Sequence, residues 1–281
     1  MADTLTLMKG EGALASLIQT DVQETSAFFS AAEQIPTAGG VQRLKTLRIT
    51  GNAGLVAEGG AKPVLKTEAV ETQLPELKAA FVTTFTEEMV ADTPGFVDAF
   101  RKAAVTKLVR DIDGYISGTI ETPSGINLQS FADTAITQVE IADDVYADYK
   151  RAHQVALGQG HFPTDVVTSP STFGAVSLAT PPVGLPVLGS DQWYGADVHT
   201  TRALTDGAVL GDFDSQAVYG IIGSGVDIRF ATTGSVPMPD GTEANLLVEN
   251  KVAAVVEMRF VWGLRDETAF VRLAPAADPA E

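Results

Sequence analysis

Basic and apolar side chains alternate with a period of two along Arg43–Thr50, a pattern that predicts a β-strand. We expect its partner to be the β-rich run Phe81–Phe85 further along the chain. Between the two lies Glu58-Gly59-Gly60-Ala61-Lys62-Pro63, where glycine permits many φ angles and proline fixes its own. The pattern therefore predicts a long exposed hairpin with this turn at its tip, and such loops usually contact another molecule.

A helical period starts at Thr93-Pro94, where we expect threonine to cap the helix and proline to take the first helical position. Apolar residues then recur every three or four positions, and no breaker occurs before Gly118. About 25 residues at ~1.5 Å each predict a rod about 37 Å long. We expect its polar face to be solvated or to pair with another subunit. The apolar positions are Val97, Phe100, Ala104, Leu108, Ile112 and Tyr115, and the polar face carries Arg101, Lys102, Lys107, Arg110, Asp111 and Asp113.

The rest of the chain predicts a mixture of helices and strands, and so an α+β protein. The first forty residues predict an arm with one partial helix. Val139–Leu157 predicts a second amphipathic helix, capped by Asp143-Asp144. Residues 246–262 predict a long strand with one packed and one polar face. Shorter strands are predicted at Asp165–Thr168, Asp197–Thr200, Ala208–Gly211 and Asp266–Leu273.

Composition fits a folded chain, since 45% of the 281 residues are hydrophobic. No apolar run of 18 residues and no leader-like N-terminus occurs, so we expect neither membrane insertion nor secretion by a signal peptide. The absence of cysteine excludes disulfides, thiolate metal sites and thiol nucleophiles. The net charge of −17 disfavours sequence-specific binding to nucleic acid, because the phosphate backbone would be repelled.

The sequence lacks the motifs that are typical of enzymes. His153, His161 and His199 are scattered without the spacing of a metal site, and we expect surface or capping side chains. No hydrolase, kinase or dinucleotide motif occurs, and no helix follows Gly223-Ser224-Gly225 to complete a phosphate site. We therefore expect no catalytic residue, no cofactor and no metal. The alternative is a soluble α+β enzyme with dispersed carboxylates, which would be a monomer or small oligomer with a concave acidic pocket.

The order of these parts resembles the HK97-fold major capsid proteins of tailed bacteriophages. The resemblance covers about residues 41–273, and the order and spacing of several short motifs carry it together. These motifs are Val56–Pro63 in the extended loop, Asp92-Thr93-Pro94 at the long helix, Leu185-Pro186-Val187, Gly211-Asp212-Phe213, Asn250 with Glu257-Met258-Arg259, and Ala269-Phe270.

The resemblance implies an HK97-like capsid fold in five consecutive parts. It also implies a structural protein, not an enzyme, that self-assembles into an icosahedral capsid shell around phage double-stranded DNA. The subunit would assemble in the host cytoplasm and remain in the virion. The five parts are an N-terminal arm (1–40), an extended β-hairpin or E-loop (41–92), a peripheral domain with the spine helix (93–126), an axial domain (127–220) and C-terminal strands of the peripheral domain (221–281).

The implied partners are copies of the same chain, in pentamers and hexamers, together with scaffolding, portal and cement proteins. DNA would be confined without sequence-specific binding, and no membrane would be involved. An encapsulin-like nanocompartment, which stores a cargo enzyme in the same kind of shell, is the alternative within this fold. Subunit contacts are expected at Glu58, Gly59, Gly60, Lys62 and Pro63.

Crosslinking members of this family join a loop lysine to an asparagine of a neighbouring subunit, releasing ammonia and forming an isopeptide bond with the help of a glutamate. The matching positions here are Lys62, Asn250 and Glu257. A separation of seven places Asn250 and Glu257 on opposite faces of a regular strand, so the site needs a bulge or a turn at Asn250. Non-covalent packing, with Lys62 an ordinary exposed lysine, is the alternative.

Overall fold

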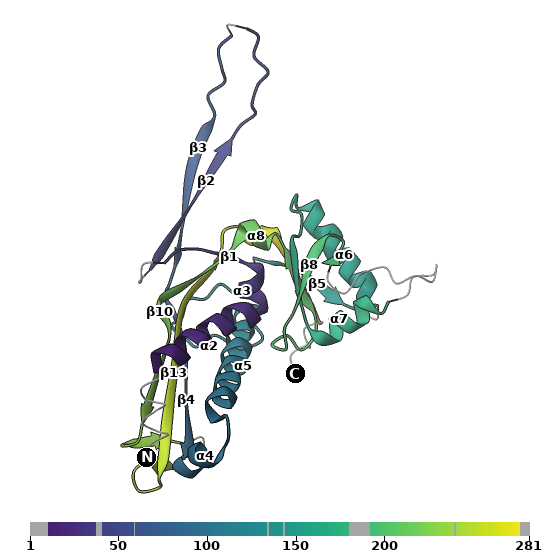
Figure 1. Cartoon of the computed structure of the whole chain (residues 1–281). Coiled ribbons are helices and arrows are strands. Elements are labelled where there is room, and N and C mark those ends of the chain that lie inside the picture. Colours follow the sequence, from purple (N-terminus) through teal and green to yellow (C-terminus); the bar gives the residue numbers. More distant parts are fainter. Residues whose placement is uncertain are drawn as a thin grey trace.

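The computed structural model describes residues 11–37, 41–58, 60–133, 135–142, 144–179, 192–238 and 240–275, with the backbone alone for residues 46–48. The chain forms an elongated lobe, a second lobe beside one end of it, and a long hairpin that projects away from both (Figure 1). Each lobe is built on its own β-sheet. The described chain is therefore a mixed α+β structure, as the sequence predicts.

The elongated lobe contains a four-stranded sheet in the order β1-β10-β13-β4. The central strand β13 pairs antiparallel with both β10 and β4. Met258 and Phe260 of β13 are buried and Arg259 between them is exposed, as the predicted alternation requires. The predicted start at residue 246 is wrong, because residues 246–250 form turns, and Ala253 and Val261 on the predicted polar face are buried as well. The four strands are β1 (Glu33–Gln34), β10 (Ala217–Ala231), β13 (Lys251–Leu264) and β4 (Leu77–Thr86).

Two helices, α2 (Glu11–Thr25) and α5 (Phe96–Ser117), pack on this sheet (Figure 1). α5 buries Phe100, Leu108 and Ile112 at the predicted spacing, whereas Val97 is exposed. The helix ends at Gly118, whose φ of 75° suits glycine. At about 1.5 Å per residue, its 22 residues span about 33 Å.

The predicted start of this helix is wrong. Thr93 follows the short helix α4 (Glu87–Asp92), which Thr86 caps by accepting a hydrogen bond from the backbone N–H of Met89. α5 begins after Gly95, which has a φ of 72° and no side-chain cap. Threonine and proline favour turns as well as helix starts, so the pattern at Thr93 marks the turn between two helices.

The described part of the predicted N-terminal arm, residues 11–37, contains helices and packs into the main core. α3 (Ala27–Ala31) follows α2 directly. Ile18, Phe28 and Phe29 are fully buried, and the ring of Phe29 stacks on Tyr219 of β10 at 4.6 Å between centroids. Burial of these large side chains outweighs any tendency of the segment to extend.

The second lobe contains a six-stranded sheet in the order β5-β14-β9-β6-β8-β7. The helices α6 (Val145–Gly158) and α7 (Pro170–Ser177) cover one face around Tyr149 and Trp193. The other face contributes Phe270 to the main core. The strands are β5 (Thr137–Ile141), β14 (Phe270–Pro275), β9 (Ala208–Gly211), β6 (Asp165–Thr168), β8 (Ala196–Thr200) and β7 (Gln192–Trp193).

The three short strands predicted before residue 220 are confirmed as β6, β8 and β9. The helix predicted over Val139–Leu157 starts too early, because Val139 lies in β5 opposite Leu273 of β14. Asp144 caps α6 as predicted, with its carboxylate accepting from the N–H groups of Tyr146 and Ala147 at 3.1 Å each, whereas Asp143 lies outside the described residues.

The closing strand β14 joins the six-stranded sheet, although the predicted boundaries group residues 221–281 with the other lobe. Its hydrogen-bonded neighbours are β5 and β9. Val271 and Leu273 are fully buried there, so the strand completes the core of the second lobe. The order of elements along the chain does not show which sheet a terminal strand joins, because that depends on long-range strand pairing.

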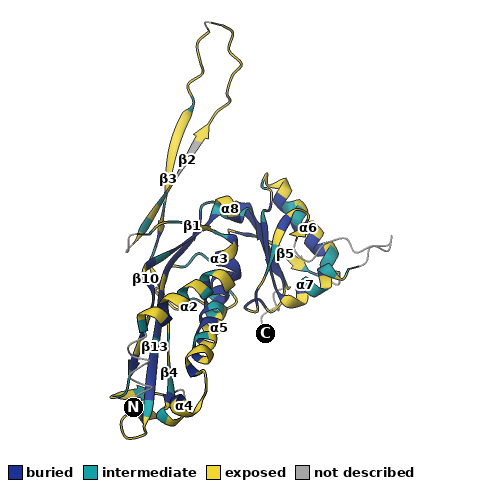
Figure 2. Ribbon diagram, in the orientation of Figure 1, coloured by how far each residue is buried: buried dark blue, intermediate teal, exposed yellow. Residues whose placement is uncertain are grey.

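The projecting hairpin consists of β2 (Gln42–Thr50) and β3 (Lys66–Leu74), paired antiparallel along their full length. The predicted partner Phe81–Phe85 is wrong, because this run lies in β4 and pairs with β13. There Phe85 is buried in the main core, which stabilises this apolar run more than an exposed hairpin could. Figure 2 shows the hairpin exposed along most of its length, and the predicted range 41–92 also includes β4 and α4.

Irregular features complete the fold. Gly223-Ser224-Gly225 lies where the register of β10 against β13 shifts, and Gly225 has a φ of 72°. The described part of the chain has no helix that could span a membrane. The remaining short elements are α8 (Phe213–Gln216), β11 (Ser235–Pro237), β12 (Glu243–Asn245) and a 3₁₀ turn at Glu267–Ala269.

Candidate functional site

The tip of the hairpin, residues 51–58 and 60–65, has no regular secondary structure. The apolar side chains of Leu55 and Val64 are 108% and 97% exposed, which is the exposure of an extended chain. The tip therefore offers apolar surface that its own chain does not cover. The predicted contact residues Glu58, Gly60, Lys62 and Pro63 are all exposed, and Gly59 lies outside the described residues.

Asn250 lies in the turn before β13, not within the strand. Its φ of 50° is the left-handed conformation that asparagine tolerates better than most residues. Its backbone carbonyl accepts a hydrogen bond from the N–H of Glu87 at 2.9 Å, while the residue as a whole is exposed. Asn250 therefore lies in a turn, as the predicted crosslink requires, directly before β13 in the elongated lobe.

Glu257 lies on the outer face of the four-stranded sheet among cations. The Lys78 ammonium contacts its carboxylate at 2.8 Å, and the Arg229 guanidinium lies at 3.5 Å. The hydrogen bond from Lys78 lowers the pKa of Glu257, and the charges of Arg229 and Arg259 lower it further. The carboxylate therefore stays ionised and is a weak proton acceptor in the isolated subunit.

Lys62, Asn250 and Glu257 do not come together within one chain. Seven residues of strand at ~3.3 Å each separate Asn250 from Glu257 by about 23 Å. Lys62 belongs to the segment that joins β2 and β3 at the tip of the hairpin. The hairpin projects away from both lobes (Figure 1). Any reaction among the three would therefore need side chains from different subunits.

Asp113 is a buried charge that the sequence places on the solvated face of α5. Its carboxylate accepts hydrogen bonds from the hydroxyls of Ser26 at 2.6 Å and Thr201 at 2.7 Å, and from the N–H of Ala27 at 3.3 Å. It thereby joins α3, α5 and the segment after β8. Burial raises the pKa of Asp113 to about 6, although these hydrogen bonds oppose the shift. Nothing in the helical pattern distinguishes Asp113 from the half-buried Asp111, which pairs with Lys107.

A serine, a histidine and an aspartate meet where α3 contacts β6 and β8. The Ser30 hydroxyl lies 3.3 Å from Nδ1 of His199, whose Nε2 lies 2.9 Å from the Asp165 carboxylate. However, the Ser30 hydroxyl donates to the carbonyl oxygens of Ser26 and Ala27 at 2.9 and 3.1 Å. This hydroxyl is thus held by its own helix, and the array connects segments of the fold instead of presenting a nucleophile.

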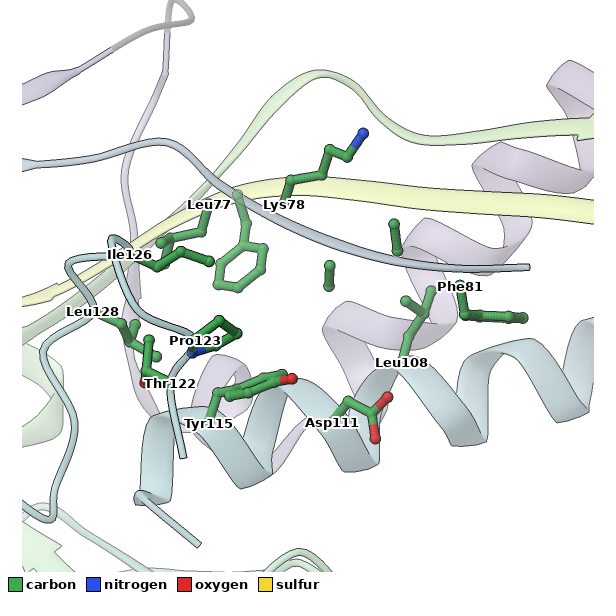
Figure 3. A pocket seen from close by; sticks show the side chains of 13 residues that line it. Leu77, Lys78, Phe81, Leu108, Asp111, Tyr115, Thr122, Pro123, Ile126 and Leu128 are labelled. Carbon is green, nitrogen blue, oxygen red and sulfur yellow. The ribbon is translucent and has the colours of Figure 1, made fainter. Parts of the chain in front are cut away.

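A small pocket of about 150 Å³ lies between β4, α5 and residues 122–128 (Figure 3). Leu77, Phe81 and Leu108 give it a largely apolar lining, with Tyr115 on the helix side. Ligand sites usually occupy about 300–1,000 Å³, so this pocket is small for a cofactor. Among the described residues, no three His, Asp or Glu side chains are grouped as a metal site.

No family model and no curated protein matches the chain. Its fold, in contrast, is shared with solved structures over nearly the whole length. A chain from Mycobacterium phage Adephagia superimposes with a TM-score of 0.69 at 15% identity, covering 91% of each chain. A chain from Gordonia phage Cozz gives a TM-score of 0.68 at 20% identity, covering 90% of this chain and 87% of that one.

The third similar structure is titled as the capsid of a native GTA particle. It gives a TM-score of 0.58 at 14% identity and covers 90% of this chain and 91% of that chain. The class defined by these structures is the mixed α+β fold of phage and GTA capsid chains, and this chain has that fold. The fold expected from the resemblance is thus confirmed at the level of the whole chain.

Proposed function

We propose that the chain is the structural subunit of an icosahedral capsid shell that encloses the double-stranded DNA of a tailed phage or related particle. The observation that carries this proposal is the fold shared over about 90% of the chain with phage and GTA capsid structures. An enzyme is the weaker alternative, because the shared fold is that of capsid structures.

The projecting hairpin supports assembly. Leu55 and Val64 are fully exposed at its tip, and burying such a side chain against a neighbour contributes about 1.5–3 kcal/mol. Each subunit in a closed shell makes heterologous contacts with its neighbours, so every copy of the tip can be covered. We assign the hairpin as the E-loop and its tip, including Lys62 and Pro63, as the main subunit contact.

The division into domains follows from this assignment. The elongated lobe with α5 is proposed to be the peripheral domain, and the second lobe to be the axial domain at the centre of pentamers and hexamers. Subunits would first form a rounded precursor with a scaffolding protein and then rearrange as DNA enters through a portal. The net charge of −17 favours DNA confined by the shell over DNA bound to it.

A covalent crosslink remains a proposal within this function. Lys62 of one subunit would attack the Asn250 amide of a neighbour, the new C–N bond would form, and ammonia would leave. Glu257 would have to lose the ion pair with Lys78 before it could take up a proton. Shells whose subunits separate in boiling detergent would instead favour non-covalent packing.

The test is assembly of the purified chain, measured by light scattering and electron microscopy in the presence and absence of a scaffolding protein. We expect closed spheres of megadalton mass, or pentamers and hexamers that convert to them. The double variant Leu55→Ser with Val64→Ser should assemble poorly, while Leu17→Ser with Leu178→Ser, which also changes exposed residues, serves as the control. A stable species at the monomer mass of 29.5 kDa under all conditions would overturn the proposal.

A further inference from the structure

Two arginines face a groove between the lobes without an acidic partner. The groove has a volume of about 800 Å³, and Arg110 on α5 and Arg202 after β8 both line it. Both side chains are exposed, and neither forms an ion pair with another described residue. Thr106 and Thr200 belong to the same lining. In a chain with 36 acidic and 19 basic residues, this groove is a site for an anionic group.

Four aspartates gather at another edge of the second lobe. Asp165 and Asp197 are paired residues at the starts of β6 and β8. Thr164 joins the group, because its hydroxyl donates to Asp165 at 2.7 Å and accepts from the N–H of Asp214 at 3.3 Å. Burial raises the pKa of Asp214, and the charges of Asp165, Asp212 and Asp197 raise it further.

This aspartate cluster is also incompletely neutralised. His199 contacts Asp165, but Asp197 and Asp214 are exposed and form no ion pair within the described chain. Among the described residues, these aspartates are not grouped as a metal site. A cationic partner from outside the chain would relieve the repulsion.

The arginine groove and the aspartate cluster lie at opposite ends of the same two strands. β6 and β8 run parallel from Asp165 and Asp197 to Thr168 and Thr200. Thr200 ends β8 three residues after Asp197, about 10 Å along the strand, and Arg202 lies in the turn two residues further on. Opposite charges at opposite ends suit a heterologous contact, in which two different patches meet and rings can close.

We propose that Arg110 and Arg202 of one subunit bind the carboxylates of Asp197 and Asp214 on a neighbouring copy of the chain. The inference rests on the proposed shell function and names one contact within it. Guanidinium and carboxylate groups pair through two parallel hydrogen bonds, which fixes orientation as well as distance. A second copy fits better than nucleic acid, because the net charge of −17 repels a phosphate backbone while every copy carries the complementary aspartates.

Charge exchange tests this contact. Arg110→Glu with Arg202→Glu, and separately Asp197→Arg with Asp214→Arg, should each lower the assembled fraction at low salt at least about tenfold. The variant carrying all four substitutions has the wild-type net charge and should recover assembly to within about threefold. The matched control is Lys102→Glu with Lys150→Glu, because these lysines are exposed, unpaired among the described residues and equally distributed over α5 and the second lobe.

The outcomes separate the inference from the proposed function. Circular dichroism first establishes that each variant is folded. If the wild type assembles and both double variants assemble equally well, or if the fourfold variant recovers nothing, the contact is wrong while the shell function stands. A groove variant that assembles normally but loses bound nucleic acid would assign the arginines to DNA instead and also overturn the contact. If the wild type never assembles, both proposals fall.

Discussion

Asp113 gives a quantitative prediction about pH. The pKa of its carboxyl is about 6 in the folded chain against a reference value of 3.8. At ~1.36 kcal/mol per unit, the difference corresponds to about 3 kcal/mol. Because the folded pKa is the higher one, this stability is fully present below pH 3.8 and is lost as the pH rises through 6. Ionised Asp113 therefore weakens the fold at neutral pH.

The substitution Asp113→Asn isolates this contribution, since asparagine does not ionise. One side-chain oxygen remains to accept from Ser26 or Thr201, and the loss of the other acceptor costs about 1 kcal/mol. Because the wild type loses stability as the pH rises and the variant does not, we expect the variant to gain stability relative to the wild type between pH 5 and pH 8. The expected change in the difference over that interval is about 1.4 kcal/mol.

The assay is urea unfolding followed by tryptophan fluorescence, at a concentration where light scattering finds no assembly. The two tryptophans, Trp193 and Trp262, are fully buried in different cores, so both cores are monitored. Asp111→Asn on the same helix is the matched control for loss of a negative charge. A wild-type-to-variant difference that is the same at pH 5 and pH 8 would refute the reasoning.

Two further substitutions test the core and the tip. Phe29→Ala removes a ring stacked on Tyr219, so it should lower the unfolding free energy by about 3–5 kcal/mol in the same assay. Phe162→Ala, at an exposed position, should lower it by less than about 0.5 kcal/mol. Equal losses in the two variants would contradict the core position of Phe29. Lys62→Arg keeps the charge but should abolish any detergent-resistant subunit ladder in assembled shells, while Lys102→Arg should not. A ladder that survives Lys62→Arg would exclude Lys62 as the crosslinking residue.

The sequence predicts the elements that have a clear local pattern. β6, β8 and β9 are short strand-like runs, part of β13 has one packed and one polar face, and the core face of α5 follows from Phe100, Leu108 and Ile112. The errors occur where pairing at long range decides. Phe81–Phe85 has the pattern of a strand, but the pattern carries no information about whether β2 or β13 is its partner. The pattern of β14 likewise does not show that this strand pairs within the six-stranded sheet.

The candidate sites also differ in whether the sequence alone reveals them. Exposure of the tip follows from Gly60, Lys62 and Pro63, because such turns lie at surfaces. In contrast, Asp113 looks like a surface residue in the sequence and is buried only because Ser26 and Thr201 come from distant segments to donate to it. Buried polar groups of this kind depend on tertiary partners, so a helical period cannot reveal them.

The burial of the N-terminal segment decides which part of the subunit can move during assembly. Rotating α2 and α3 as an arm would expose Ile18, Val22, Phe28 and Phe29, at about 1.5–3 kcal/mol each. The total, of order 6–12 kcal/mol, is comparable to the whole stability of a domain. Among the described side chains of the hairpin, Leu74 is buried in a core and Leu44 packs against it, both near the base, so the hairpin can bend as a unit at lower cost. Deletion of residues 1–35 would therefore test folding rather than assembly, and the rearranging element of the proposed shell is the hairpin.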